Sequence, residues 1–144
     1  RTLTAYFRQI HEDLGATSWC HSELEPFVRE EYRRLVLPRE IRPIRDLGEH
    51  QNPFSVLSAE MDRSHAAVIL RPLRAGMEAE KNTMDHLMLF RRESIANIFF
   101  IIDLGCSWHA LFVPGLLKQG FRPRLILPNA GEGDTVMFQE GDFL

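Results

Sequence analysis

Two short stretches pair a cysteine with a histidine, and they hold the side chains most capable of chemistry. Cys20 and His21 are adjacent in "WCH", and Cys106 precedes His109 by one helical turn in "CSWH". Thiolates and imidazoles are the usual ligands of structural zinc, so a Cys2His2 set can be drawn from these four residues. Because adjacent Cys20 and His21 make an awkward chelate, we expect no metal site.

Cys106 also suits a second chemistry, a thiol activated by a neighbouring base. It follows a predicted strand and precedes a predicted helix, where a thiolate would be stabilised, and His109 is near enough to serve as the base. A structural thiol at a helix start is the more common alternative. His109 is itself a candidate catalytic residue pointing into a cleft, or an ordinary polar residue at the start of its helix.

Basic residues are concentrated in one part of the chain. The segment from Arg29 to Arg45 holds six arginines and three glutamates. Such a run can dock an acidic partner or a phosphate, whereas a solvated helix face is the usual explanation.

The composition predicts one soluble globular domain. The chain has 144 residues, of which 44% are hydrophobic and 26% charged, and its formal charge is −3. This balance gives no drive toward nucleic acid or a membrane, and no apolar run reaches the roughly 18–20 residues of a membrane span. Two cysteines in a chain of this length indicate free thiols in a reducing compartment, and we expect the cytoplasm.

The first third of the chain predicts two helices and an edge strand. Apolar residues at helical spacing indicate a helix over residues 3–14. A second helix is expected from a capping box of Ser22 and Glu25 as far as Pro38, with a core face of Phe27, Tyr32 and Leu35. Residues 39–46 predict a short edge strand interrupted by Pro43.

The rest of the chain alternates predicted strands and helices. Residues 54–61 and 67–70 indicate a hairpin, and Glu78 to Arg92 indicate a helix with Met84, Leu87 and Met88 inward. "NIFFIIDLG" is a buried strand, followed by a helix over 107–119 that Pro114 kinks or delays. "FRPRLILP" and "DTVMFQE" are the last strands. The order predicts an α/β (α+β) fold with a mixed, mostly antiparallel sheet, a parallel central pair and flanking helices.

This succession of elements resembles the GNAT superfamily of acyl-CoA N-acyltransferases. Every element of that fold except its first strand has a candidate here. Because the chain opens on Arg1 without an initiator methionine, we expect residues 1–144 to be a single GNAT-like domain cut from a longer chain. The best local match is the ending K-x-G-F at Lys118, Gly120 and Phe121. Leu116 stands where the family has the tyrosine that reprotonates coenzyme A.

The resemblance also implies a cofactor site. The family grips the pyrophosphate of acetyl-CoA with a glycine-rich turn at a helix start, where backbone N–H groups bind the anion. Here the turn is "RPLRAGMEAE", which has one glycine and an acidic Glu78 in the last glycine slot. The residues placed at the cofactor are Leu70, Arg71, Arg74, Ala75 and Gly76.

The same resemblance gives the candidate general base. Glu60 and Asp62 lie near the turn of the predicted hairpin, where a GNAT base could act on an amine through water. A solvated turn with charged residues is the alternative. Glu60 and His109 are therefore the candidate catalytic residues.

Two functions remain open from the sequence. One is an acetyl-CoA-dependent N-acyltransferase, or a transferase of another acyl-CoA. The other is a non-catalytic module that binds a small ligand or the other domains of its parent chain. The ending of the chain, with Phe121, Pro128, "GEGD" and Gln139, is similar to GNAT-like domains of bacterial regulatory proteins that also carry a histidine-kinase-type ATPase domain. A metal-dependent or thiol enzyme ranks third.

Overall fold

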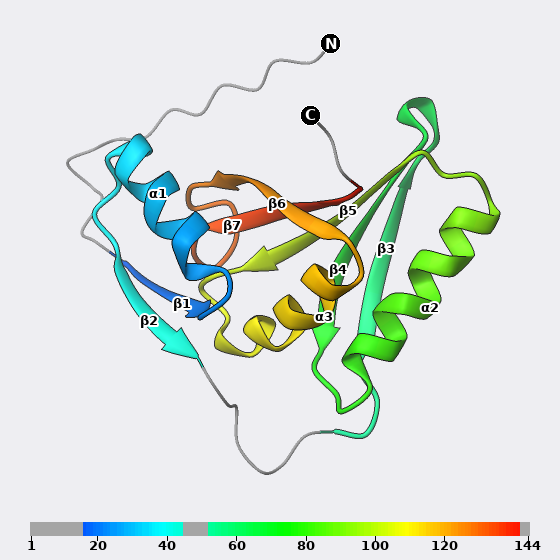
Figure 1. The fold of residues 1–144 in the computed structure, drawn as a ribbon, viewed down its shortest axis with the longest axis horizontal. Coiled ribbons are helices and arrows are strands. Elements are labelled where there is room, and N and C mark those ends of the chain that lie inside the picture. The colour runs from blue at the N-terminus through cyan, green and yellow to red at the C-terminus, as the bar shows by residue number, and fades with distance from the viewer. Residues whose placement is uncertain (1–15, 45–51, 142–144) are drawn as a thin grey trace.

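The computed structural model describes residues 16–44 and 52–141. The helix predicted over residues 3–14 and the end of the strand predicted over 39–46 lie outside the described residues. The elements that follow are arranged around one five-stranded sheet, with a smaller two-stranded sheet beside it (Figure 1).

The large sheet confirms the predicted fold class. Its strands are β3 (Val56–Asp62), β4 (Ala67–Arg74), β5 (Asn97–Asp103), β6 (Phe121–Leu127) and β7 (Thr135–Glu140). They are ordered β3-β4-β5-β7-β6, and only β4 and β5 are parallel. The parallel pair is joined by a helical crossover because two parallel strands cannot be connected by a tight turn.

The two parallel strands pair over only part of their length. Ala67–Leu70 of β4 lie opposite Asn97–Phe100 of β5, and no further register positions follow. Both strands nevertheless continue, β4 to Arg74 and β5 to Asp103. The strands therefore part at their carboxyl ends, in the middle of the sheet.

Two helical segments cover one face of the large sheet. Helix α2 (Ala79–Arg92) crosses from β4 to β5, and the 3-10 helix η3 (Ser107–Phe112) leads into α3 (Val113–Lys118). Pro114 lies in the first turn of α3, so the predicted delay of this helix is confirmed. Both segments add to a single core cluster whose centre holds the fully buried Phe100, Phe121 and Phe138.

The small sheet contains a strand that the sequence did not predict. β1 (Thr17–His21) pairs in parallel with β2 (Glu40–Ile44), and α1 (Glu25–Leu35) connects them. Its residues alternate between half-buried and buried, but five residues between two predicted helices are too few for this alternation to be recognised in the sequence. The strand is attached to the large sheet by a hydrogen bond from Trp19 N to Leu104 O, at 2.8 Å.

The predicted capping box at the start of α1 is wrong. The N-cap is Leu24, which makes no side-chain cap, and the helix instead begins with a proline in its first turn. Leu24 is buried in the core, so packing rather than a polar cap fixes this helix start. The helix ends where Val36 takes a left-handed conformation, with φ of 54°.

The predicted inner face of α2 is also partly wrong. Leu87 is buried as expected, but Met84 and Met88 are 43% and 48% exposed. The buried positions are Ala79, Thr83, Leu87 and Phe90. Thr83 is tolerated inside because its hydroxyl donates to Ala79 O, at 2.8 Å, which removes the cost of burying it unpaired.

This register predicts different effects for two neighbouring truncations in α2. Leu87→Ala should lower the free energy of unfolding by about 2–5 kcal/mol, because it opens a cavity in the core. Met88→Ala, one residue later, should change it by less than about 0.5 kcal/mol. Urea denaturation of both variants measures the difference. Equal losses would contradict the helix orientation described above.

Candidate functional site

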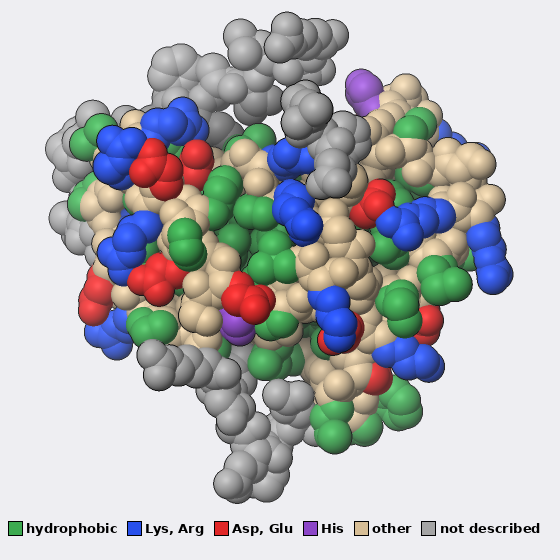
Figure 2. Space-filling model, in the orientation of Figure 1, with side chains coloured by type: hydrophobic (Ala, Val, Ile, Leu, Met, Phe, Trp, Pro, Cys, Tyr) green, Lys and Arg blue, Asp and Glu red, His purple; other side chains and the backbone are tan. Residues whose placement is uncertain are grey.

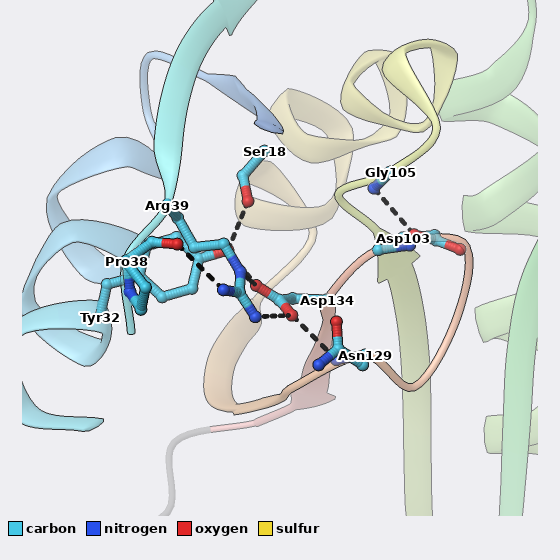
Figure 3. A network of polar contacts seen from close by, with 9 residues as sticks. Ser18, Tyr32, Pro38, Arg39, Asp103, Gly105, Asn129 and Asp134 are labelled. Atoms are coloured by element: carbon cyan, nitrogen blue, oxygen red, sulfur yellow. Dashed lines mark hydrogen bonds and ion pairs between the residues drawn. The ribbon is translucent and has the colours of Figure 1, made fainter. Parts of the chain in front are cut away.

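A buried ion pair joins the two sheets. Arg39 lies between α1 and β2, and Asp134 immediately precedes β7; their side chains are each 1% exposed. The guanidinium donates twice, from Nε to Asp134 Oδ2 at 2.7 Å and from Nη2 to Oδ1 at 3.1 Å. Figure 3 shows the two planar groups facing each other, the bidentate arrangement that makes such a pair strong.

The remaining acceptor capacity of Asp134 is also used. Tyr32 of α1 donates its hydroxyl to Oδ2 at 2.7 Å, and the backbone N–H of Asn129 donates to Oδ1 at 2.8 Å. The Tyr32 oxygen in turn lies 2.6 Å from the Ser18 hydroxyl on β1. The network thus connects β1, α1, the start of β2 and the β6–β7 loop through one carboxylate.

The electrostatics of the network keep Asp134 ionised. Burial alone would raise the pKa of its carboxyl, but the hydrogen bonds from Arg39 and Tyr32 outweigh burial and leave the pKa below its usual value. Burial raises the pKa of Tyr32, so this phenol stays protonated and donates. Because folding lowers the pKa of Asp134, its ionised carboxylate stabilises the fold at any pH above the pKa that it has in the unfolded chain. This stabilisation is lost as the pH falls through the lower pKa of the folded state.

A second carboxylate fixes the same loop from the other side. Asp103, the last residue of β5, accepts hydrogen bonds from the backbone N–H groups of Gly105 at 2.8 Å, Glu132 at 2.7 Å and Gly133 at 3.1 Å. A side chain on Gly105 would overlap the backbone of Gly133, and one on Gly131 would overlap the Asp103 carboxylate. These glycines allow two loops to touch backbone to backbone.

His109 lies in this region, but its geometry does not suit a general base. Its Nδ1 accepts the backbone N–H of Asp103 at 2.9 Å, so the neutral ring carries its proton on Nε2. The side chain is 8% exposed, and burial lowers the pKa of His109 to about 4. The ring nitrogen that would accept a substrate proton is therefore already occupied.

The position of His109 explains how the parting strands are accommodated. Leu104 N–H donates toward β7, to Asp134 O. Because successive N–H groups of a strand point to opposite sides, Asp103 N–H points toward the side from which β4 has departed. The His109 imidazole accepts that N–H in place of a β4 carbonyl.

Both cysteines are protonated thiols. Burial, followed by a hydrogen bond from Cys106 Sγ to Glu132 Oε2 at 3.2 Å, raises the pKa of Cys106 to about 12. Burial likewise raises the pKa of Cys20 to about 12. Burial first, and the acidic side chains of Glu132 and Asp103 after it, thus favour the thiol of Cys106 over the thiolate expected at the start of η3.

Cys20, His21, Cys106 and His109 are the four residues from which a Cys2His2 set can be drawn. Within residues 16–44 and 52–141, no group of three or more His, Cys, Asp or Glu side chains could hold a metal ion. Cys20 is 1% exposed and its thiol donates to His21 O at 3.4 Å.

The turn before α2, where the resemblance places the pyrophosphate of coenzyme A, is filled by the chain itself. A side chain on Gly76 would overlap the backbone of Phe54 and Ser55. Met77 N–H donates to Asn52 O at 2.8 Å. The Glu78 carboxylate accepts the backbone N–H of Ser55. The Met77 N–H is thus bonded to an internal carbonyl, and the Glu78 carboxylate adds negative charge beside the start of α2.

The remaining predicted site residues are dispersed. Leu70 is fully buried in the core, and Arg71 and Arg74 are exposed on β4. Arg74 Nε donates to Phe54 O at 3.2 Å. Glu60 is exposed on β3 and directly opposite Ile69. Ala75 is half-buried beside Gly76. Glu60 and His109, the two candidate catalytic residues, are on β3 and η3. In the described part of the chain, no hydrogen bond or ion pair joins their side chains.

The arginine-rich segment carries its own counter-charges. On α1, Arg29 pairs with Glu25, Arg33 with Glu30 and Arg34 with Glu31. Figure 2 shows acidic and basic side chains interleaved over this helix rather than gathered into a basic patch. The geometry matches a solvated helix face with i,i+3 and i,i+4 pairs, which is the simpler of the two explanations given by the sequence.

Sequence reasoning missed the central residues of the buried network. The sequence places Arg39 in a run of arginines typical of a solvated helix face, gives Tyr32 a position in the core, and puts Asp134 at the start of a strand. One signal was available: the "GEGD" turn places two glycines next to an acid, which is typical of a loop whose backbone binds a carboxylate or is approached closely.

Comparisons of this chain with protein-family models, with curated proteins and with solved structures found no match. In the described part of the chain, no helix is both long and apolar enough to cross a membrane.

The ion pair predicts a large effect for a small substitution. Asp134→Asn should lower the free energy of unfolding by about 3–5 kcal/mol, because it removes the carboxylate charge from a buried ion pair. The matched control is Glu30→Gln, which removes an exposed partner of Arg33 and should have a much smaller effect, because exposed ion pairs are screened by water and salt. Chemical denaturation at neutral pH measures both. An Asp134→Asn cost as small as the control would contradict a buried pair.

The low pKa of His109 predicts a pH-dependent stability. Between the ordinary histidine pKa of 6.5 and the folded-state value of about 4, only the unfolded chain takes up the proton, so stability falls as the pH falls. From pH 7 to pH 5 this residue should account for a loss of about 2 kcal/mol. His109→Asn keeps an acceptor for Asp103 N–H and cannot titrate. Denaturation curves of the variant should therefore show a smaller loss over that range; an unchanged loss would refute the assignment.

Proposed function

We propose that this chain is a GNAT-like domain that serves as a binding or docking module of a larger protein and does not transfer acyl groups. The observation that carries the proposal is the filled turn before α2. There the Glu78 carboxylate accepts Ser55 N–H, and Gly76 is packed against the 54–55 backbone. A phosphate would meet a carboxylate where it needs N–H donors.

The arrangement of the strands supports the GNAT-like part of the proposal. A mixed sheet in the order β3-β4-β5-β7-β6, with β4 and β5 parallel, matches the succession of elements on which the resemblance rests. The parting of β4 and β5 after Leu70 and Phe100 is the gap that an acyl-CoA site in such a sheet would require.

Three side chains support the non-catalytic part. Leu116, in the position of the family's tyrosine acid, is fully buried and has no proton to donate. His109 has its acceptor nitrogen bonded to Asp103 N–H. Glu60 is exposed on β3. None of these three supplies a positioned acid or base.

The setting we propose is a cytoplasmic, multidomain regulatory protein. Both cysteines of the chain are free, as expected in a reducing compartment. The other domains of that protein are the proposed partners, and the ending with Phe121, Pro128 and Gln139 resembles domains of bacterial regulators.

The second candidate is an acyl-CoA N-acyltransferase, and one observation favours it. Beyond Leu70 and Phe100, β4 and β5 continue without pairing to each other, and an extended acyl chain could lie between these unpaired segments. In that case Arg71 and Arg74 would carry the attraction for the phosphates.

Titration with acetyl-CoA separates the two candidates. We expect neither heat of binding in calorimetry nor a rise in melting temperature up to millimolar acetyl-CoA, because the Glu78 carboxylate lies beside the predicted phosphate position and would repel the phosphates. Micromolar binding would overturn the proposal.

A matched variant makes the titration decisive. Arg74 is exposed, so Arg74→Glu should fold normally and reverse the charge at the predicted phosphate site. If acetyl-CoA binds the original chain and Arg74→Glu weakens that binding about tenfold or more, the site is the predicted cofactor site and the transferase candidate is favoured.

A further inference from the structure

We propose that two copies of this chain associate through strand β3, in antiparallel register about Ala59, and join their large sheets into one. This inference concerns a surface that the proposed function does not use. It rests on the open edge of the sheet and on unpaired charges and apolar side chains that match across a two-fold axis.

The first observation is an available edge. β3 is the terminal strand of the five-stranded sheet, and within the described residues no strand lies on its outer side. It extends over seven residues, Val56–Asp62. A strand edge of this length presents a row of backbone donors and acceptors that can pair with a further strand.

The second observation is the register that a symmetric pairing would take. Ala59 is the middle residue of β3 and is exposed. With Ala59 opposite its own copy, all seven residues of each strand are used. Met61 then lies opposite the partner's Leu57, and Glu60 lies opposite the partner's Ser58. Directly opposite residues share a face in antiparallel pairs.

One face of this pairing is apolar. Leu57 packs against the core cluster, so Leu57, Ala59 and Met61 are on the helix-bearing face of the sheet. Met61 is 41% exposed in the single chain. A second copy would cover Met61 with its Leu57, and the two-fold axis repeats this contact, so the same pairing removes apolar surface from water twice.

The opposite face carries complementary charges. Ser58 lies directly opposite Arg71 of β4, and Glu60, two residues on, is on the same face. Both Glu60 and Arg71 are exposed. Neither side chain has an ion-pair partner among the residues that the structure describes. Across the two-fold axis, Glu60 of one copy faces Ser58 of the other copy. Arg71 of that other copy lies on β4, directly behind its small Ser58 side chain. The guanidinium of Arg71 can therefore reach the carboxylate of Glu60.

Charge also selects the register. A pairing centred on Glu60 would place two carboxylates directly opposite each other, which is unfavourable. Centring on Ala59 separates them and brings each toward an arginine. Because a two-fold interface is self-complementary, it forms both Glu60–Arg71 contacts at once.

Sedimentation equilibrium or light scattering across the micromolar range tests the association. The unaltered chain should form a dimer that dissociates on dilution. Ala59→Arg places two guanidinium groups at the axis and should give a monomer whose circular dichroism is unchanged. Leu125→Arg is the control: Leu125 is 36% exposed on β6, at the other edge of the sheet, and this variant should remain dimeric.

A charge exchange tests the register independently of folding. Glu60→Arg and Arg71→Glu should each weaken dimerisation by about tenfold, since each removes two symmetric attractions. The double variant exchanges the charges and should recover most of the affinity. A monomer at all concentrations, a dimer indifferent to Ala59→Arg, or a double variant weaker than both single variants would each overturn the proposal.

Discussion

The buried ion pair between Arg39 and Asp134 is the interaction on which the arrangement of this domain depends. It is the point where the β1–α1–β2 unit meets the five-stranded sheet, and it lies in a region with almost no exposure. A buried carboxylate must have all its acceptor positions filled. Tyr32 and the Asn129 N–H complete this set, so the helix, the small sheet and the β6–β7 loop are all positioned around one side chain.

The polar residues near the end of β5 are used in a similar way. Asp103 binds three backbone N–H groups, and His109 binds the N–H of Asp103. Glu78 does the same for Ser55. In each case a group that could act on a ligand satisfies the backbone of an irregular segment, which would otherwise be buried unpaired. The chemistry available to the domain is reduced because these groups are structural.

The sequence predicted the sheet well and the polar network poorly, for a physical reason. Strands such as Asn97–Asp103 show their burial in a continuous apolar run, and a helix shows its inner face in its spacing. Even so, the spacing predicts Met84 and Met88 on the inner face, because an apolar side chain such as methionine suggests burial even where it is exposed. The sequence does not predict β1, because its five residues are too few to show a clear alternation of buried and half-buried positions. The partners of Asp134 depend on contacts between distant segments, which local patterns do not contain.

The same ion pair has a consequence for the order in which the chain can acquire its structure. Arg39 and Asp134 are 95 positions apart, and Tyr32 and Asp134 are 102 apart. The small sheet and its helix are complete in sequence by Ile44, yet Asp134, whose carboxylate holds them, follows only after β6. Closing so long a loop is entropically costly and slows folding. On the ribosome, the N-terminal unit must therefore remain undocked until almost the entire domain has been synthesised.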